Sequence, residues 1–140
     1  MTKGIPRQTQ SIIAAGLIAV LTIAVFAQAR FSGPESAVRL YHYGIANREL
    51  ETVKSVSLQD PKVGSARQLQ AQVEKLFASG GVPQIGPVQK RGRQAVVLVT
   101  YRSPRFQPVL LQFVMQKSRA RWKVDTDATW GLSQARIPNR

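Results

Sequence analysis

The chain has 140 residues, and its 20 Lys and Arg against 7 Asp and Glu give a formal net charge of +13 at pH 7. The absence of cysteine excludes disulfides, thiolate metal sites and cysteine nucleophiles. The chain has one histidine, His42, and a histidine-based metal site needs more than one. We therefore expect no metal, and no sequence motif indicates another cofactor.

The N-terminal segment from Gln8 to Ala29 contains no charged residue, and Arg7 and Arg30 bracket it. Residues 11–29 would rise about 28 Å as a helix, close to the hydrocarbon thickness of a bilayer. We predict a cytoplasmic N-terminus at residues 1–10 and a transmembrane anchor at 11–29. The large apolar residues of this predicted span are Ile12, Ile13, Leu17, Ile18, Val20, Leu21, Ile23, Val25 and Phe26.

A cleaved signal peptide is the alternative for the same segment. Ala27-Gln28-Ala29 fits a small-x-small cleavage site, and Lys3 and Arg7 supply the basic start. Both interpretations place residues 30–140 on one side of the membrane, and basic residues before the span favour a cytoplasmic N-terminus. We therefore expect the bulk of the chain on the periplasmic or lumenal side of a bacterial inner or internal membrane.

The domain predicted over residues 35–130 follows a hinge at 30–34 and begins with helices. Ser32 and Glu35 have the spacing of a capping box, and apolar positions recur every three or four residues after them. These positions are Ala37, Leu40, Tyr41, Gly44 and Ile45. A shorter helix over 50–56 should end before Asp60-Pro61, because the residue before a proline disfavours helical backbone.

A third helix should begin at a second capping box, Ser65 to Gln68, and end at Gly80-Gly81. The pattern then changes. Residues 82–87 contain two prolines and could form at most an edge strand. Alternating or β-branched runs over 94–101, 108–117 and 121–130 predict a meander of antiparallel strands, and residues 131–140 have no periodic pattern and are predicted to be an irregular tail.

Helices followed by strands predict an α+β class, with helices packed on a curved antiparallel sheet of three or four strands. The segments ESAVRLYHYGIANRELETVKSV, VVLVTYRSP, LLQFVMQK and RWKVDTDATW resemble the nuclear-transport-factor-two-like (cystatin-like) fold of small bacterial extracytoplasmic domains. The resemblance covers about residues 34–130 and implies a cone with a pocket between sheet and helices. Some members of that family are enzymes resembling ketosteroid isomerase or scytalone dehydratase and others bind or assemble, so function depends on the site.

The candidate pocket residues come from the first helix and the predicted strands. They are Tyr41, His42, Phe113, Trp122 and Trp130. His42 has no evident acidic or nucleophilic partner in the sequence, which favours a structural role, although an enzyme using His42 and a tyrosine remains an alternative. Alternation places Asp125 and Asp127 on the sheet face opposite Trp122, where we expect ion pairs with basic neighbours. We expect no catalytic residue.

Basic residues dominate the C-terminal part of the chain, with eleven Lys and Arg against two Asp from Val82 onward. In a meander, the turns near 90–93 and 118–121 fall at one end of the sheet, with Arg102 and Arg105 at the other. The predicted cluster is Lys90, Arg91, Arg93, Lys117, Arg119 and Arg121. Such a cluster suits anionic lipid or an acidic partner, or serves as a solvated surface. Nucleic acid is not expected outside the membrane.

The second face of the sheet is half apolar, which a solvated monomer does not need. Its apolar positions are Val96, Leu98, Leu110 and Val114. We therefore expect a membrane-anchored, non-catalytic domain that is a subunit or assembly factor of a larger membrane complex, with lipids and other subunits or a homodimer partner as its contacts. The alternatives are a tethered or secreted module that binds a small ligand in the cone, and a small enzyme of the ketosteroid-isomerase type.

Overall fold

The computed structural model describes residues 33–135. Contacts within the chain divide it into two units, residues 1–31 and 32–140, and the described residues belong to the second. Within the described residues, no helix is both long and apolar enough to cross a membrane. The predicted span at 11–29 lies outside them.

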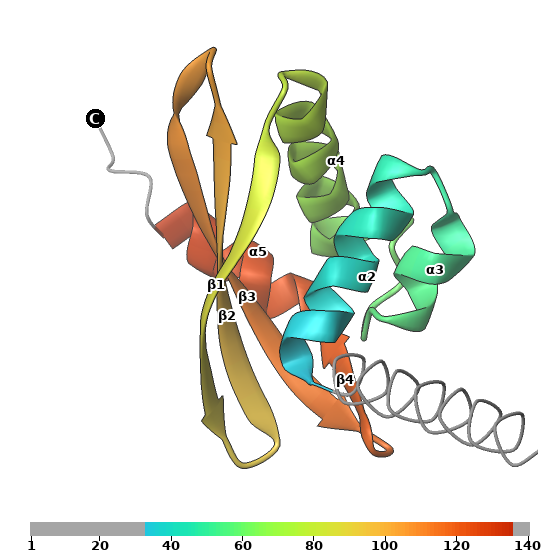
Figure 1. Cartoon of the computed structure of the whole chain (residues 1–140). Helices are drawn as coiled ribbons and strands as arrows, with labels where there is room; N and C mark the ends of the chain where they lie inside the picture. Colours follow the sequence, from blue (N-terminus) through green and yellow to red (C-terminus); the bar gives the residue numbers. More distant parts are fainter. Residues whose placement is uncertain (1–32, 136–140) are drawn as a thin grey trace, which may run out of the picture. The chain divides into compact units, whose positions relative to one another are not determined.

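The domain is a four-stranded antiparallel sheet with helices before and after it in the chain (Figure 1). The helices that precede the sheet are α2 (Pro34–Ala46), α3 (Leu50–Ser55) and α4 (Gly64–Ala78). The sheet consists of β1 (Val82–Arg91), β2 (Gln94–Ser103), β3 (Phe106–Ser118) and β4 (Arg121–Val124), followed by α5 (Thr126–Ala135). The strands lie in the order β1-β2-β3-β4. Helices α2 and α4 lie against one face of this sheet, and α3 packs against α2 (Figure 1). The predicted α+β class with an antiparallel meander is confirmed.

β1 is an edge strand, as its prolines predicted, although it is longer than expected. It pairs with β2 from Val82 to Arg91, and the register shifts between Ile85 and Val88. Pro87 lies inside this irregular stretch, where a residue without an N–H group disturbs the ladder least. A Cβ added to Gly86 would lie 3.1 Å from the carbonyl oxygen of Leu98 on β2. A side chain at this position would crowd β2, which favours glycine in the irregular stretch.

The core lies between the sheet and α2, α3 and α4. Alternate residues of β2 and β3 point into it, and the largest fully buried side chains there are Tyr101, Phe113 and Met115. Helix α2 contributes Val38, Tyr41 and Ile45. The predicted stripe on this helix is wrong at one position. Leu40 is 41% exposed, because the buried face turns through Val38 and His42 instead.

Neither helix has the N-cap residue that its predicted capping box implied, and Ser32 lies outside the described residues. Gly33 is the N-cap of α2 and has an extended backbone, and Pro34 occupies the first helical turn, where its fixed φ favours helix entry. Helix α4 begins at Gly64 with Val63 as its N-cap, two residues ahead of the predicted N-cap Ser65. Neither helix has a side-chain cap hydrogen bond, so backbone geometry sets both starts.

The strand predicted over 121–130 is correct only to Val124. Helix α5 begins at Thr126 and runs to Ala135, so it also replaces the first half of the predicted irregular tail. The carboxylate of Asp125 accepts a hydrogen bond from the backbone N–H of Ala128 at 3.1 Å, which is helix N-capping geometry. Capping by Asp125 therefore ends the strand and places Trp130 on a helix.

Candidate functional site

Aromatic side chains fill the space between α2 and the sheet, where the resemblance implied a pocket. The His42 ring centroid lies 5.1 Å from that of Phe113 and 5.6 Å from that of Tyr101. Tyr41 makes an edge contact with Phe113 at 5.8 Å, and Phe77 of α4 lies 6.0 Å from His42. These separations are typical of packed aromatic pairs. We call Tyr41, His42, Phe77, Tyr101 and Phe113 the aromatic cluster.

Both ring nitrogens of His42 have hydrogen-bond partners inside this cluster. Nδ1 lies 2.7 Å from the carbonyl oxygen of Val38, which can only accept, so Nδ1 carries the proton. Nε2 is then the acceptor, and the Tyr101 hydroxyl donates to it at 2.5 Å. The Tyr101 hydroxyl is the one member of this arrangement that the sequence did not indicate, because Tyr101 lies 59 residues away on β2.

Burial shifts the protonation of these groups toward their neutral forms. Desolvation lowers the pKa of His42 to about 4, outweighing the hydrogen bond to Val38, which acts in the opposite direction. Desolvation also raises the pKa of Tyr101, with a smaller contribution from Tyr41. It likewise raises the pKa of Tyr41, with a smaller contribution from Glu74. At neutral pH the cluster is therefore uncharged, and His42 is a poor general base.

The structure brings together three of the five candidate pocket residues, Tyr41, His42 and Phe113. Trp122 lies instead on β4, paired with Lys117 across the β3–β4 ladder, and is 9% exposed. Trp130 lies on α5 and packs against the edge of the core. The two tryptophans therefore belong to different parts of the domain from the aromatic cluster.

Two hollows of the described surface include members of the aromatic cluster in their walls. One of about 320 Å³ opens between α2 and β1, and His42 and Phe77 form part of its wall. Its remaining lining is Arg39, Tyr43, Ala46, Asn47, Pro83 and Ile85. A larger groove of about 750 Å³ runs between α2, α3 and α4, with Arg48, Gln70 and Glu74 among its lining residues. Tyr43 is 54% exposed, so its ring borders solvent at the first hollow.

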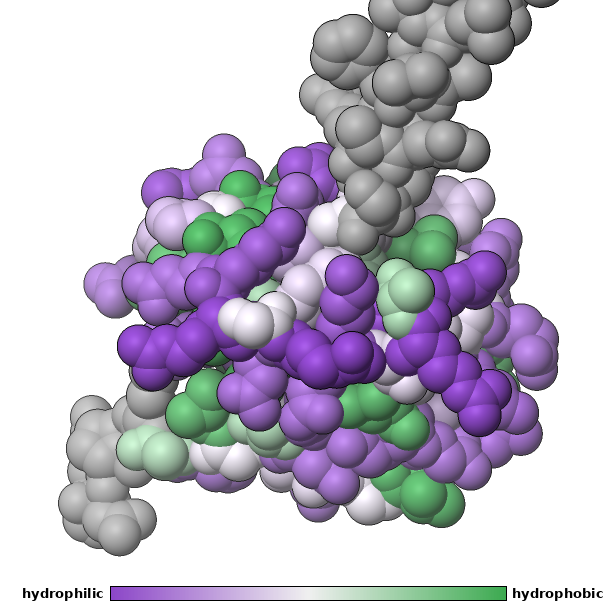
Figure 2. Space-filling view, turned by 90° about the horizontal axis from the view of Figure 1, so that it is seen from below, coloured by the Kyte–Doolittle hydropathy of each residue, from purple (hydrophilic) through white to green (hydrophobic). Residues whose placement is uncertain are grey.

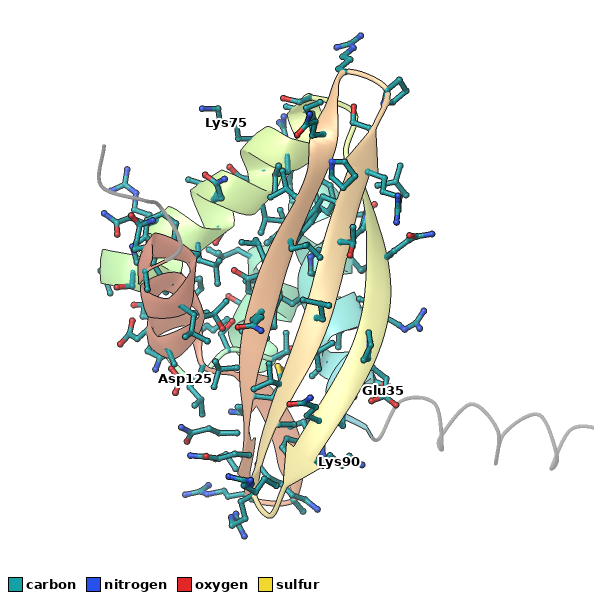
Figure 3. The ribbon with its side chains drawn as sticks, turned by 90° about the vertical axis from the view of Figure 1, so that its left-hand side faces the viewer. Glu35, Lys75, Lys90 and Asp125 are labelled. Carbon is teal, nitrogen blue, oxygen red and sulfur yellow. The ribbon has the colours of Figure 1, made fainter. Side chains whose placement is uncertain are left out.

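Asp125 is buried at the junction of β4 and α5, and it does not lie on the sheet surface as predicted (labelled in Figure 3). Its carboxylate accepts hydrogen bonds from the amide side chains of Gln59 and Gln116, both at 3.0 Å. Gln59 in turn accepts from the backbone N–H and the hydroxyl of Thr126. The predicted ion pairing of Asp125 with basic residues is therefore wrong, and its role here is to hold the start of α5. Asp127 is exposed in the first turn of that helix.

The six predicted cluster residues lie together at one end of the sheet, which we call the basic end. It consists of Lys90, Arg91, Arg93, Lys117, Arg119 and Arg121, all exposed. The two turns are joined directly, because the Lys117 N–H donates to the Arg93 carbonyl at 2.8 Å and the Arg93 guanidinium donates to the Lys117 carbonyl at 2.9 Å. Figure 2, the view from below, shows hydrophilic side chains across much of the described surface at this end, with small apolar patches between them.

The candidate partner face lies on the side of the sheet opposite α2 and α4. Figure 3 views this face, and no described helix lies across its centre. Val96 pairs with Val114, Leu98 with Gln112, and Leu110 with Thr100. Leu110 is 46% exposed and the other three apolar residues are half-buried. The four residues therefore form a shallow, partly apolar surface.

Comparisons with known proteins gave no match to a family model, to a curated protein or to a solved structure. The assignment of a function therefore depends on the geometry of the domain itself.

Proposed function

We propose that this protein is a single-pass, membrane-anchored, non-catalytic domain that acts as a subunit or accessory factor of a larger membrane complex. In this proposal residues 11–29 hold the chain in a bacterial inner or internal membrane, and the α+β domain lies on the periplasmic or lumenal side. We further infer that the domain is a member of the nuclear-transport-factor-two-like group, in a form whose interior is filled by side chains.

The observation that carries the non-catalytic part of the proposal is the aromatic cluster. Both nitrogens of His42 are hydrogen-bonded, and its lowered pKa keeps it neutral at the pH of a cell. A general base needs a free nitrogen within reach of a substrate proton. Since Val38 and Tyr101 use both nitrogens, His42 serves the packing of α2 on the sheet.

The partner face supports a role in assembly. Four apolar residues lie on a sheet surface that the described helices leave open, and Leu110 exposes nearly half of its side chain. Apolar surface of this kind is stabilised when a second protein covers it. We propose that another subunit of the complex, or a second copy of the chain, occupies this face.

Purification of tagged protein from its native membranes in mild detergent tests this function. We expect stoichiometric partner proteins, or a homodimer, and we expect the L110Q/V114T variant to lose them while remaining folded. The matched control is L40Q, since Leu40 is similarly exposed but lies on the helical layer. If the partner proteins still co-purify with L110Q/V114T but are lost from L40Q, the contact lies on the helical layer and not on the partner face.

A second candidate function is the binding of a small apolar ligand. The observation that favours it is the hollow of about 320 Å³ beside His42, whose walls include Tyr43, Phe77 and Ile85. Concave, mostly apolar sites of this size are typical of ligand pockets. A small molecule retained by the purified protein and lost on Ile85→Arg would favour this candidate over the assembly role.

A further inference from the structure

We propose that the basic end is a docking surface for the anionic headgroups of the membrane that anchors the chain. This inference rests on the proposed function, because it needs the span at 11–29 to hold the domain at a bilayer. It goes further by assigning one end of the domain, and six residues, to a direct lipid contact.

The charge at this end is unopposed over a long stretch of sequence. From Val82 to Val124 the chain carries no Asp or Glu, so the entire sheet is free of acidic residues. Over the same stretch it carries nine basic residues: Lys90, Arg91, Arg93, Arg102, Arg105, Lys117, Arg119, Arg121 and Lys123. Six of these nine are in the two turns of the basic end, so most of the positive charge of the sheet is gathered at one place.

The geometry of the two turns keeps these cations exposed. Arg119 and Ala120 form the tip of the β3–β4 hairpin, and both have positive φ angles, 48° and 66°. Backbone twist of this kind is typical of a tight two-residue hairpin. The ammonium groups of Lys90 and Lys117 lie 6.0 and 5.9 Å from the centroid of the Trp122 ring, so a cation–π contact positions both lysines beside it.

The chain also enters the domain at this end. Figure 3 labels Glu35, in the first turn of α2, and Lys90 of β1 toward the same end, whereas Lys75 in the last turn of α4 lies toward the other. Only residues 30–33 separate the predicted span from Pro34, and four extended residues reach at most about 14 Å. Residues 30–33, which we call the connector, would therefore tether the domain to the proposed anchor through the end that carries the basic residues.

Figure 3 labels two acidic residues on the side of this end, Asp125, which is buried, and Glu35. The Glu35 carboxylate group folds back toward Gly33, since a Cβ added to Gly33 would lie 2.7 Å from Glu35 Oε1. A carboxylate in this position stabilises the positive N-terminal end of α2. One acid beside six cations leaves the end strongly positive. Its attraction to an anionic surface acts over about 8 Å at physiological salt, which is within the reach of the connector.

An acidic protein is the other partner with suitable charge. The position of the chain entry favours lipid, because the proposed anchor is joined to this end of the domain by a connector of four residues. We therefore assign the surface to lipid headgroups and leave an acidic protein as an outcome of the test.

The test is hydrogen exchange of the full chain in lipid nanodiscs, comparing phosphatidylcholine discs with discs that also contain phosphatidylglycerol. We expect amides in 89–94 and 117–121 to exchange several-fold more slowly in the anionic discs, and 0.5 M NaCl to abolish the difference. In R91Q/R119Q/R121Q we expect the equilibrium constant for docking to fall about five-fold for each group removed. The matched control R102Q/R105Q/K75Q removes three charges from the other end and should retain the protection.

The outcomes are distinguishable even if a variant fails to fold, because the lipid and salt comparisons use the unmodified chain. Equal exchange in both disc types, with the chain firmly anchored, would overturn this inference alone. Protection seen in native membranes but absent from anionic discs would overturn it in favour of an acidic protein. A chain that alkaline carbonate removes from the discs would overturn the anchor and this inference together.

Discussion

His42 is the residue whose environment differs most from what its sequence position suggests. It lies on α2 between two tyrosines, Tyr41 and Tyr43, and only the first of these packs with it in the core. Its partner, Tyr101, comes from the middle of the chain. A buried histidine of this kind stabilises the core in its neutral form, because burial removes the water that would solvate the charged imidazolium.

Because His42 is buried in its neutral form, the free energy of unfolding of the domain should depend on pH. The pKa of His42 is about 4 in the folded domain against an ordinary value of 6.5, so the unfolded chain binds more protons between these values. The contribution of His42 is complete above pH 6.5 and is lost as the pH falls toward 4. The free energy of unfolding should decrease by about 3 kcal/mol over this range.

Urea denaturation of the full chain in detergent at several pH values measures this effect. In H42Q, whose side-chain amide can still accept from Tyr101 and donate to Val38, the profile between pH 6.5 and 4 should be much flatter. If the free energy of unfolding of H42Q fell with pH as steeply as that of the unmodified protein, the pH dependence would belong to other groups. That result would contradict the buried neutral state of His42.

At the scale of elements, the junction between β4 and α5 decides how the C-terminal part of the chain folds. Residues 121–130 alternate as a strand would, but β4 pairs with β3 only as far as Val124. Beyond that point, α5 packs beside β3 and α4. The hydroxyl of Thr129 accepts from the Val114 N–H at 2.9 Å and the Asp125 N–H donates to the Val114 carbonyl at 2.8 Å. The helix thus takes over part of the strand edge that β4 leaves free.

Asp125→Ala should destabilise the domain by about 2 kcal/mol, because it removes the N-cap of α5 and leaves the half-buried side-chain amides of Gln59 and Gln116 without their acceptor. Hydrogen exchange should increase across 126–135 in this variant. Asp127→Ala is the matched control, since Asp127 is exposed in the same helical turn and should cost no more than about 0.5 kcal/mol. Similar losses in both variants would contradict the capping role of Asp125.

The order of elements and the sheet topology could be predicted because they depend on local patterns. The spacing of apolar residues indicates the three helices before the sheet. Runs of alternating and β-branched residues indicate the strands, and the turns between them are signalled by Arg91-Gly92 and Ser103-Pro104. The start of α5 could not be predicted in the same way. The carboxylate of Asp125 is hydrogen-bonded to Gln59, which lies 66 residues earlier in the chain. No local sequence pattern indicates a contact over that separation. The pairing of His42 with Tyr101 was missed for the same reason.

At the scale of the whole molecule, charge and apolar surface lie on different parts of the domain. The basic end gathers six cations near the point of chain entry, and the partner face presents Leu110 and its neighbours on the open side of the sheet. This separation allows one domain to contact lipid and a second protein at the same time. The gathering of cations could be predicted from the meander alone, because consecutive antiparallel turns alternate between the two ends of a sheet.

The central claim is that the chain keeps its apolar segment and is held in a membrane by it. Intact-protein mass spectrometry of a C-terminally tagged chain, recovered from carbonate-washed native membranes, tests this most directly. We predict a mass that retains residues 8–29, found in the membrane pellet. A mass beginning at Arg30, found in the soluble fraction, would contradict it.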